Sequence, residues 1–344
     1  MKACLLVNSG IEDVAELELK EFLGSNKKIK SFANVLEFEL KDKQELLDLS
    51  KKIQSARRLL ISLGKTKKVD DFEFDGKIVW KELLPKEINF KVEVEGVKGN
   101  ENRLEIAKKI AGKFYSSLEE DKSENKIEAT IDLKNPKLLL VVFFNGKEYF
   151  IGFDDNIKEL NLRTYRLFPH QASFKGDLAY YFLRKSQYNP QNDNLLLGFC
   201  KDGIVAIEAA LFAKNLENKK DKNETKRILA VDESTQNIIA AKKNAKLAKI
   251  EDSLEIKKMD VDELDVKFSE KEFDCLIFLV TSKDEKKLNE LYYQSSYILK
   301  SKGKLMLISR KDWELSVSNK FKLLEKKEII KGESTYKYHL MERK

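Results

Sequence analysis

The chain has 344 residues, of which 42% are hydrophobic and 36% charged, a balance typical of globular proteins with a heavily charged surface. No apolar run approaches the roughly 18 to 20 residues that cross a bilayer. Three scattered cysteines and two histidines exclude a disulfide framework and a zinc knuckle. The formal net charge of +7 is compatible with nucleic-acid binding without demonstrating it. We expect a cytoplasmic, metal-free protein of two or three domains without a signal peptide.

The first 64 residues alternate strands and helices. Short apolar runs predict strands at residues 4–7, 35–40 and 59–63. Helical spacing predicts one helix with Ala15, Leu19 and Phe22 on one face, ended by Gly24, and a second over residues 46–57. This order predicts a ferredoxin-like α+β domain over residues 1–64.

Residues 65–158 predict a second α+β unit. A short helix is expected near Trp80, and a longer one carries Ala107, Ala111 and Phe114 on one face. Strands are expected at 90–94, 127–133, 138–144 and 149–153, with a hairpin at Asn145-Gly146. The charged stretch 119–126 is expected to be a loop.

The third segment, residues 163–344, alternates strands and helices and predicts a doubly wound parallel sheet. Strands are expected at 195–197, 227–231, 254–257, 273–279 and 304–309, and helices at 204–213, 235–248 and 288–299. Residues 321–329 and 335–341, joined at 331–333, predict a terminal antiparallel hairpin, and the polar stretch 217–226 predicts a loop.

The chain resembles the THUMP-containing tRNA guanine-N2 methyltransferases over nearly its whole length. Four short stretches carry the resemblance: Asp132 to Pro136, Leu162 to Arg166, Phe199 to Gly203, and Ile207 to Ala210. The resemblance implies an α/β architecture, with a THUMP RNA-binding domain at 65–158 and a Rossmann-like methyltransferase domain at 163–344. It also implies tRNA as the partner and S-adenosylmethionine as the cofactor.

The cofactor loop departs from that family's pattern. The family's first strand ends in D-P-x-C-G-x-G, whose glycines let the backbone pass close to the cofactor. Here residues 197–203 read Leu-Gly-Phe-Cys-Lys-Asp-Gly, so only Phe199, Cys200 and Gly203 remain. The Lys201 side chain would crowd the ligand, and its charge would oppose the sulfonium. We therefore expect ordinary cofactor binding to be impaired or lost.

Two acidic residues stand where the family contacts the cofactor. Asp232 follows the second strand, where the family's acid bonds the ribose hydroxyls, and Asp260 follows the third, near the adenine. A carboxylate suits both tasks because it accepts two hydrogen bonds. The alternative is that each simply caps the element that follows it.

The catalytic loop is the clearest departure. The family carries [ND]-P-P-Y after the fourth strand, where polar acceptors hold the target amine and a ring stacks on the base. Here Leu279, Val280, Thr281 and Ser282 stand in its place. We assign no catalytic residue, and we expect Phe278 to fill the core and Cys200 to pack beneath the loop.

RNA contact is expected from basic residues elsewhere. The candidates that match the family pattern or flank loops are Lys98, Arg103, Lys134, Asn135, Arg163 and Arg166, while Lys108, Lys109 and Lys113 follow one helix. Each lysine can equally be part of a solvated face. Tyr165, Tyr180 and Tyr181 could stack on bases, although buried helical positions are the favoured interpretation.

Three hypotheses follow. The first is a tRNA-binding family member with impaired catalysis, acting alone or with a protein partner. The second is a working RNA methyltransferase with a divergent loop. The third is a protein-interaction scaffold that no longer binds RNA.

Overall fold

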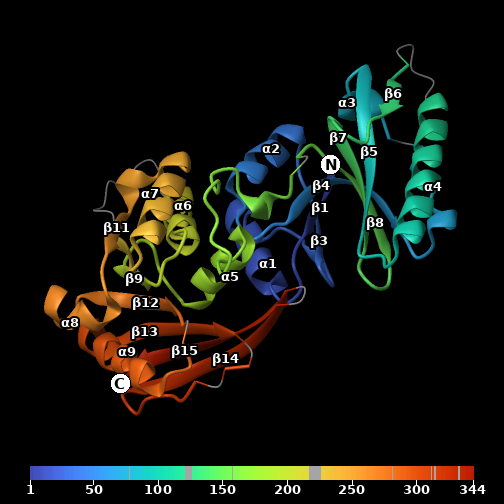
Figure 1. Cartoon of the computed structure of the whole chain (residues 1–344). Coiled ribbons are helices and arrows are strands. Elements are labelled where there is room, and N and C mark those ends of the chain that lie inside the picture. Colours follow the sequence, from blue (N-terminus) through green and yellow to red (C-terminus); the bar gives the residue numbers. More distant parts are fainter. Residues whose placement is uncertain are drawn as a thin grey trace. The chain divides into compact units, whose positions relative to one another are not determined.

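The computed structural model describes residues 1–76, 78–120, 126–156, 158–216, 226–280, 282–310, 312–313, 315–331 and 334–344. They form two compact units, of which unit 1 comprises Met1–Asn8 and Ala15–Leu160 and unit 2 comprises Ser9–Val14 and Asn161–Lys344 (Figure 1). No helix among these residues is both long enough and apolar enough to cross a membrane.

Unit 1 is built on one sheet. Its described strands are β1 (Lys2–Leu6), β2 (Lys30–Phe32), β3 (Val35–Glu39), β4 (Arg58–Thr66), β5 (Glu87–Glu95), β6 (Glu128–Ile131), β7 (Leu138–Phe144) and β8 (Tyr149–Asp154). They lie in the order β2-β3-β1-β4-β8-β7-β5-β6. The antiparallel β4–β8 pair therefore joins the strands expected for the ferredoxin-like domain to those expected for the THUMP domain. The domain boundary at residues 64 and 65 stays a prediction.

The helices of unit 1 largely follow the sequence pattern. They are α2 (Lys43–Lys52), α3 (Trp80–Leu83) and α4 (Asn100–Glu119), while α1 (Glu12–Leu23) begins among the residues of unit 2 and continues into unit 1. Gly24 ends α1 with a φ of +97°, as expected. The helix predicted over residues 46–57 was placed too late, because Ile53 is already extended and β4 begins at Arg58.

Unit 2 contains a doubly wound sheet. Its described strands are β9 (Leu195–Gly198), β10 (Ile228–Asp232), β11 (Glu255–Lys258), β12 (Phe273–Leu279), β13 (Leu299–Arg310), β14 (Phe321–Lys331) and β15 (Ser334–Arg343). The order is β11-β10-β9-β12-β13-β15-β14, in which the first five strands run parallel. β15 pairs antiparallel with both β13 and β14, which confirms the terminal hairpin.

The helices of unit 2 precede or connect those strands. They are α5 (Gly176–Lys185), α6 (Ile204–Leu216), α7 (Thr235–Leu247), α8 (Leu264–Lys267) and α9 (Glu285–Ile298). β9 and β10 are buried on both faces, which is why they read as continuous apolar runs. Because parallel strands end at the same edge of a sheet, the segments after β9, β10 and β12 meet at one edge of unit 2. The loops expected at 119–126 and 217–226 and the turn at 331–333 fall mainly on residues outside the described ranges.

Candidate functional site

The segment before α5 is fixed to unit 2 by two inward-facing arginines. Arg163 donates from Nε to Oε1 of Glu208 at 2.7 Å and from Nη2 to Oε2 at 3.0 Å. The Tyr165 hydroxyl also bonds Glu208, and Arg166 Nε donates to Asp202 Oδ2 at 2.8 Å. Both carboxylates are completely buried. These charge-assisted bonds hold the segment against α6 and the loop after β9.

This placement bears on two expectations. Arg163 and Arg166 were candidates for RNA contact, but their guanidinium groups neutralise buried carboxylates, so RNA contact by either stays a prediction. The structure buries Tyr165, Tyr180 and Tyr181. Burial was the interpretation favoured over stacking on RNA bases. Tyr180 and Tyr181 lie in α5, whereas Tyr165 lies in a turn.

Asp202 and Asn244 organise the surroundings of the loop. Asp202 accepts hydrogen bonds from the Ser173 hydroxyl and the His170 amide as well as from Arg166. Asn244, on α7, donates from Nδ2 to the Asp202 carbonyl at 3.0 Å. His170 is thus a loop residue, as the sequence indicated.

The loop after β9 is tightly constrained. A Cβ on Gly198 would lie 2.1 Å from the ring of Phe278, and one on Gly203 would lie 2.9 Å from the Cβ of Ala241. Phe199 and Lys201 adopt left-handed backbone conformations, with φ of +54° and +53°. A left-handed conformation costs a residue with a Cβ roughly 1–2 kcal/mol, so Lys201 sits in a position that suits glycine.

Asp232 braces this loop from the end of β10. Its side chain is 3% exposed. Oδ2 accepts from the Lys201 amide at 2.9 Å, and Oδ1 accepts from the Ser234 amide at 3.0 Å and from Asn237 Nδ2 at 2.9 Å. Both carboxylate oxygens are therefore engaged by the protein's own donors.

Lys201 and Cys200 are held in a poorly solvated environment. Lys201 is 9% exposed, and burial lowers the pKa of its ammonium group although Asp232 and Asp202 oppose that shift. Burial, assisted by the same two carboxylates, raises the pKa of the Cys200 thiol. The thiolate is the reactive form, so this environment disfavours a nucleophilic Cys200.

Asp260 has a local structural role. Its side chain accepts from the Asp262 amide at 3.2 Å and caps the short 3-10 turn η4 (Val261–Glu263). Asp260 itself is exposed. This is the capping alternative raised from the sequence, and adenine contact by Asp260 stays a prediction.

The segment after β12 is apolar where the family carries polar acceptors. Leu279, together with Leu197, Ile277 and Ile308, lines a cavity of about 20 Å³. Such a volume holds about one water molecule. Val280 is 8% exposed and donates its amide to the Ile308 carbonyl at 2.8 Å.

Two neighbours complete this segment. Phe278 is completely buried, which confirms its expected place in the core. The Ser282 hydroxyl accepts from the Asp284 amide at 3.2 Å, and Thr281 lies outside the described residues.

Unit 1 carries the remaining RNA candidates at two separate places. Lys98 and Arg103 are exposed beside the start of α4, where Arg103 Nε donates to the Val97 carbonyl at 2.7 Å. Lys134 and Asn135 are exposed in the turn before β7, whose amides both donate to Asp132 Oδ1 at 2.9 Å. These bonds lower the pKa of the Asp132 carboxyl.

The two places lie at opposite ends of β5. Lys137 donates its amide to Asn89, near the start of that strand, whereas Lys98 follows its end at Glu95. With about 3.3 Å per residue along a strand, the two sets are roughly 20 Å apart. The structure therefore does not gather the four candidates into one patch.

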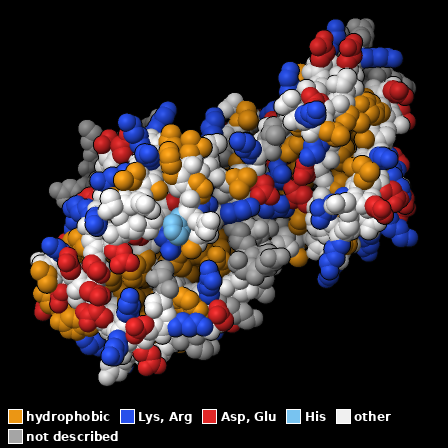
Figure 2. All heavy atoms as spheres, viewed as in Figure 1, with side chains coloured by type: hydrophobic (Ala, Val, Ile, Leu, Met, Phe, Trp, Pro, Cys, Tyr) orange, Lys and Arg blue, Asp and Glu red, His pale blue; other side chains and the backbone are white. Residues whose placement is uncertain are grey.

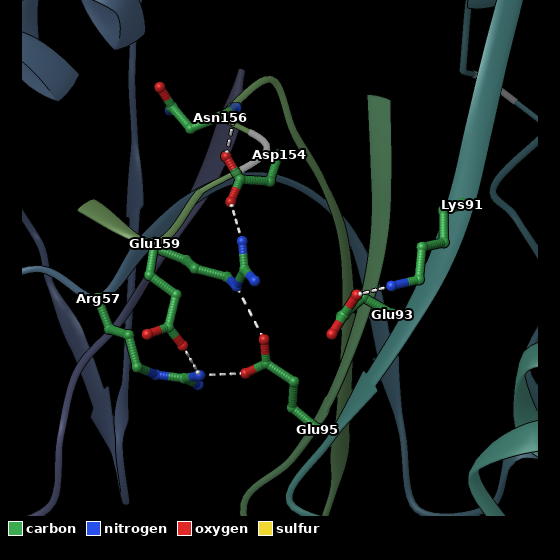
Figure 3. Close-up of polar contacts among 8 residues, drawn as sticks. Arg57, Lys91, Glu93, Glu95, Asp154, Asn156 and Glu159 are labelled. Carbon is green, nitrogen blue, oxygen red and sulfur yellow. Dashed lines mark hydrogen bonds and ion pairs between the residues drawn. The ribbon is translucent and has the colours of Figure 1, made fainter. Parts of the chain in front are cut away.

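The sequence did not indicate a network of buried and half-buried charged side chains in unit 1 (Figure 3). Arg57 bonds both Glu95 and Glu159, and Arg58 donates from Nε to Glu95 at 2.8 Å and from Nη1 to Asp154 at 2.9 Å. Glu95 lies 37 positions and Asp154 lies 96 positions from Arg58 along the chain. No local sequence pattern predicts ion-pair partners that lie so far apart in the chain. The network ties together β4, β5 and β8.

Burial and ion pairing act in opposition in that network: Glu95 and Asp154 raise the pKa of the Arg58 guanidinium in spite of burial, whereas burial prevails at Asp154. Burial raises the pKa of Asp154 to about 6, although Arg58 and the Asn156 amide oppose the shift. The side chains of Arg58 and Asp154 are 6% and 1% exposed. Removing one partner would therefore leave a charge in a poorly solvated place.

Comparisons with known proteins agree with this architecture. The sequence profile of the RMKL-like methyltransferase domain matches residues 163–335, about half of the chain, and that of the THUMP domain matches residues 73–154. The chain is 23% identical to a tRNA (guanine(6)-N2)-methyltransferase of Methanocaldococcus jannaschii, with 95% of this chain and 96% of the relative covered.

Solved structures show the same fold. TrmN from Thermus thermophilus superposes with a TM-score of 0.75 at 18% identity, covering 100% of this chain and 99% of that one. SMU.472, a putative methyltransferase complexed with SAH, gives a TM-score of 0.71 at 17% identity, with 98% and 97% covered. The expected fold, a THUMP domain followed by a Rossmann-like methyltransferase domain, is confirmed. The chain therefore belongs to the family of proteins with an RMKL-like methyltransferase domain, here preceded by a THUMP domain.

Proposed function

We propose that this protein binds tRNA and has lost most or all of its capacity for S-adenosylmethionine-dependent methyl transfer. The observation that carries the proposal is the apolar cavity at the carboxyl edge of the unit 2 sheet. Leu197 and Leu279 line it, at the positions where the family pattern has a carboxylate and a polar acceptor. The frame around the cavity is that of a methyltransferase, but these side chains offer no hydrogen bonds.

The residues of the loop do not fit S-adenosylmethionine in the family's manner. That cofactor carries a positive sulfonium, and Lys201 places a second cation at the same loop with little solvent to screen it. Its ribose needs carboxylate acceptors, and both oxygens of Asp232 already accept three bonds from the protein. Displacing the bond from the buried Lys201 amide would leave that donor unsatisfied, which costs about 1–3 kcal/mol.

The acceptor side of the reaction is equally poor. A guanine amine that enters a methyltransferase site has to donate hydrogen bonds to fixed acceptors. Leu279 cannot accept them, Val280 is largely buried, and Ser282 already accepts from the Asp284 amide. A base placed here would leave its amine unpaired, so the site disfavours the transfer.

Unit 1 supports the RNA-binding half of the proposal. Lys98 and Lys134 are exposed and form no ion pair with any residue that the structure describes. By contrast, Lys109 bonds Asp70 and Glu105, and Lys113 bonds Glu73, all within 3 Å. Unpaired lysines can bind phosphates without first breaking an ion pair.

A salt series of tRNA binding tests that half. We expect the affinity of the full chain to fall steeply with salt, and Lys98→Gln with Lys134→Gln to reduce the slope of log K against log salt by about 1.5. Lys109→Gln with Lys113→Gln is the matched control, since it removes the same charge from lysines that are already paired. Absence of binding at low salt would favour the scaffold hypothesis.

A working methyltransferase with a divergent loop is the second candidate. The observation in its favour is the relative that covers 95% of this chain and is itself a tRNA (guanine(6)-N2)-methyltransferase. Calorimetric titration of the full chain with S-adenosylmethionine separates the two. We expect no measurable heat of binding at millimolar ligand, whereas micromolar affinity would favour the enzyme.

A further inference from the structure

The outer face of α7 is unusually basic. Lys242, Lys243 and Lys246, with Lys249 directly after the helix, are all exposed. We call these four residues the α7 lysine face. The helix contains no acidic residue, and the four lysines form no ion pair among the described residues. Figure 2 shows hydrophobic and basic side chains together over the part of unit 2 where Figure 1 labels α6 and α7.

Some exposed lysines on other helices are paired with an acidic residue of the same segment. Lys20 bonds Glu16, Lys109 bonds Glu105, and Lys267 lies within 4.0 Å of Glu263, each one helical turn away. Such pairs are typical of a solvated helix surface, where opposite charges offset one another. The α7 lysine face has no such pair among the described residues.

An exposed aromatic ring is fixed beside this face. Phe168 is 39% exposed, and the Nζ of Lys243 lies 4.7 Å from the centre of its ring. Asn244, which is completely buried, accepts from the Phe168 amide and donates to the Phe168 carbonyl, both at 3.1 Å. The backbone of Phe168 is thereby held in place while part of its ring stays in solvent.

A purely structural role explains only part of this arrangement. Lysine at a helix C-terminus interacts favourably with the helix dipole, and Lys246 lies in the last turn. Lys242 lies earlier, and the dipole gives no reason for an exposed, rigidly held phenylalanine. Lysines beside an accessible aromatic ring are the elements of a surface that binds a nucleic-acid strand.

We propose that the α7 lysine face and Phe168 form a second RNA-contact surface, on unit 2. Lys242 and Lys246 are one helical turn apart and project to the same side of α7, and Lys249 follows the end of the helix, so these lysines can contact neighbouring backbone phosphates. An unpaired base would stack on the exposed part of the Phe168 ring. This inference rests on the proposed function, because it assumes that the protein binds RNA.

The test compares two triple variants of the full chain in tRNA binding across a salt series. Lys242→Gln, Lys246→Gln and Lys249→Gln should reduce the slope of log K against log salt by about 2. The control replaces three exposed lysines elsewhere in unit 2, Lys286, Lys287 and Lys322, with Gln. The control should change the slope far less.

Two further variants keep the test decisive. Lys→Arg at the same three α7 positions retains the charge and should retain the affinity, which separates charge from folding. Phe168→Ala should weaken binding of RNA that has a single-stranded 3′ end by about tenfold and leave binding of a blunt duplex unchanged.

The outcomes separate the two levels of the argument. If wild type does not bind tRNA at low salt, the proposed function fails and this surface with it. If wild type binds and the Lys98 and Lys134 variant is weakened, but the α7 variant matches its control, the second surface is overturned and the proposed function stands. Equal binding of both RNAs by wild type and Phe168→Ala overturns the stacking contact.

Discussion

Lys201 is the residue at which the cofactor loop differs most from the family's glycine-containing pattern. It combines a left-handed backbone, with φ of +53°, and an ammonium group that is 9% exposed. Its amide also donates to Asp232 at 2.9 Å, which any residue except proline can do. The side chain can therefore be removed without loss of that bond.

We predict that Lys201→Gly stabilises the protein at neutral pH. Relief of the left-handed backbone contributes roughly 1–2 kcal/mol, against an entropic cost of about 0.5–1 kcal/mol for glycine. Burial lowers the pKa of Lys201, so the wild type carries an additional penalty below that pKa, where the lysine is charged. The gain should be largest near pH 7 and shrink as the pH rises towards the ordinary lysine value.

Urea unfolding between pH 7 and pH 11 measures this gain. Lys271→Gly is the matched control, because Lys271 is also left-handed, with φ of +60°, but is exposed. Its gain should not depend on pH in this way. A Lys201→Gly variant that is less stable than wild type, or whose advantage grows with pH, would contradict the account.

Arg58 is the second residue whose environment makes a sharp prediction. Arg58→Met should destabilise the protein by about 3–5 kcal/mol, because Glu95 and Asp154 would lose the cation between them. Lys113→Met breaks the pair with Glu73, whose side chain is 77% exposed, and should cost at most about 1 kcal/mol. Hydrogen exchange of β4 and β8 amides, with urea unfolding, measures both. Equal losses of unfolding free energy in Arg58→Met and Lys113→Met would show that the network contributes little to stability.

At the scale of elements, local sequence patterns predicted many of the strands and helices. β7 and β12 begin and end at the residues predicted from their apolar runs, and the short connection expected between the last two strands indicated the hairpin of β14 and β15. β2, with three residues, was missed because its strand character comes from pairing with β3. The sequence also did not indicate that β4 and β8 join one sheet, since that pairing links distant segments.

The candidate site was predictable only where the chain departs from a known pattern. Lys201 and Leu279 could be singled out because the family has other residues there. The inward direction of Arg163 and Arg166 could not, because their partners Glu208 and Asp202 lie 45 and 36 positions away. Side-chain direction in a turn depends on tertiary contacts, which no local periodicity reports.

The packing of β9 against β12 gives a prediction for an element. Gly198→Ala should destabilise the protein by about 1–3 kcal/mol, because the new methyl group would meet the buried Phe278 ring. Gly112→Ala, in the exposed interior of α4 with nothing within 4 Å of its Cβ, should instead stabilise by about 0.5–1 kcal/mol. Thermal unfolding of both variants checks the opposite signs. A neutral Gly198→Ala would mean that the ring can move aside.

At the scale of the whole molecule, the proposal assigns different properties to the two units: unit 1 contacts RNA, and unit 2 has lost methyl transfer. Unit 1 presents exposed lysines, Lys98 and Lys134, that form no ion pair within the described part of the chain and that RNA phosphates can contact. Unit 2 has the fold of a methyltransferase, and Leu197 and Leu279 line the cavity at the carboxyl edge of its sheet. A family member of this kind can recognise an RNA without modifying it.

Transfer of labelled methyl groups from S-adenosylmethionine to unmodified tRNA tests this account most directly. Purified full-length protein is incubated at a concentration where tRNA binding is already established, and the tRNA is digested and its nucleosides are separated. We predict no methylated guanosine above the level of a protein-free control. Methylated guanosine that wild type produces and that Leu279→Arg abolishes, with tRNA binding intact, would contradict it.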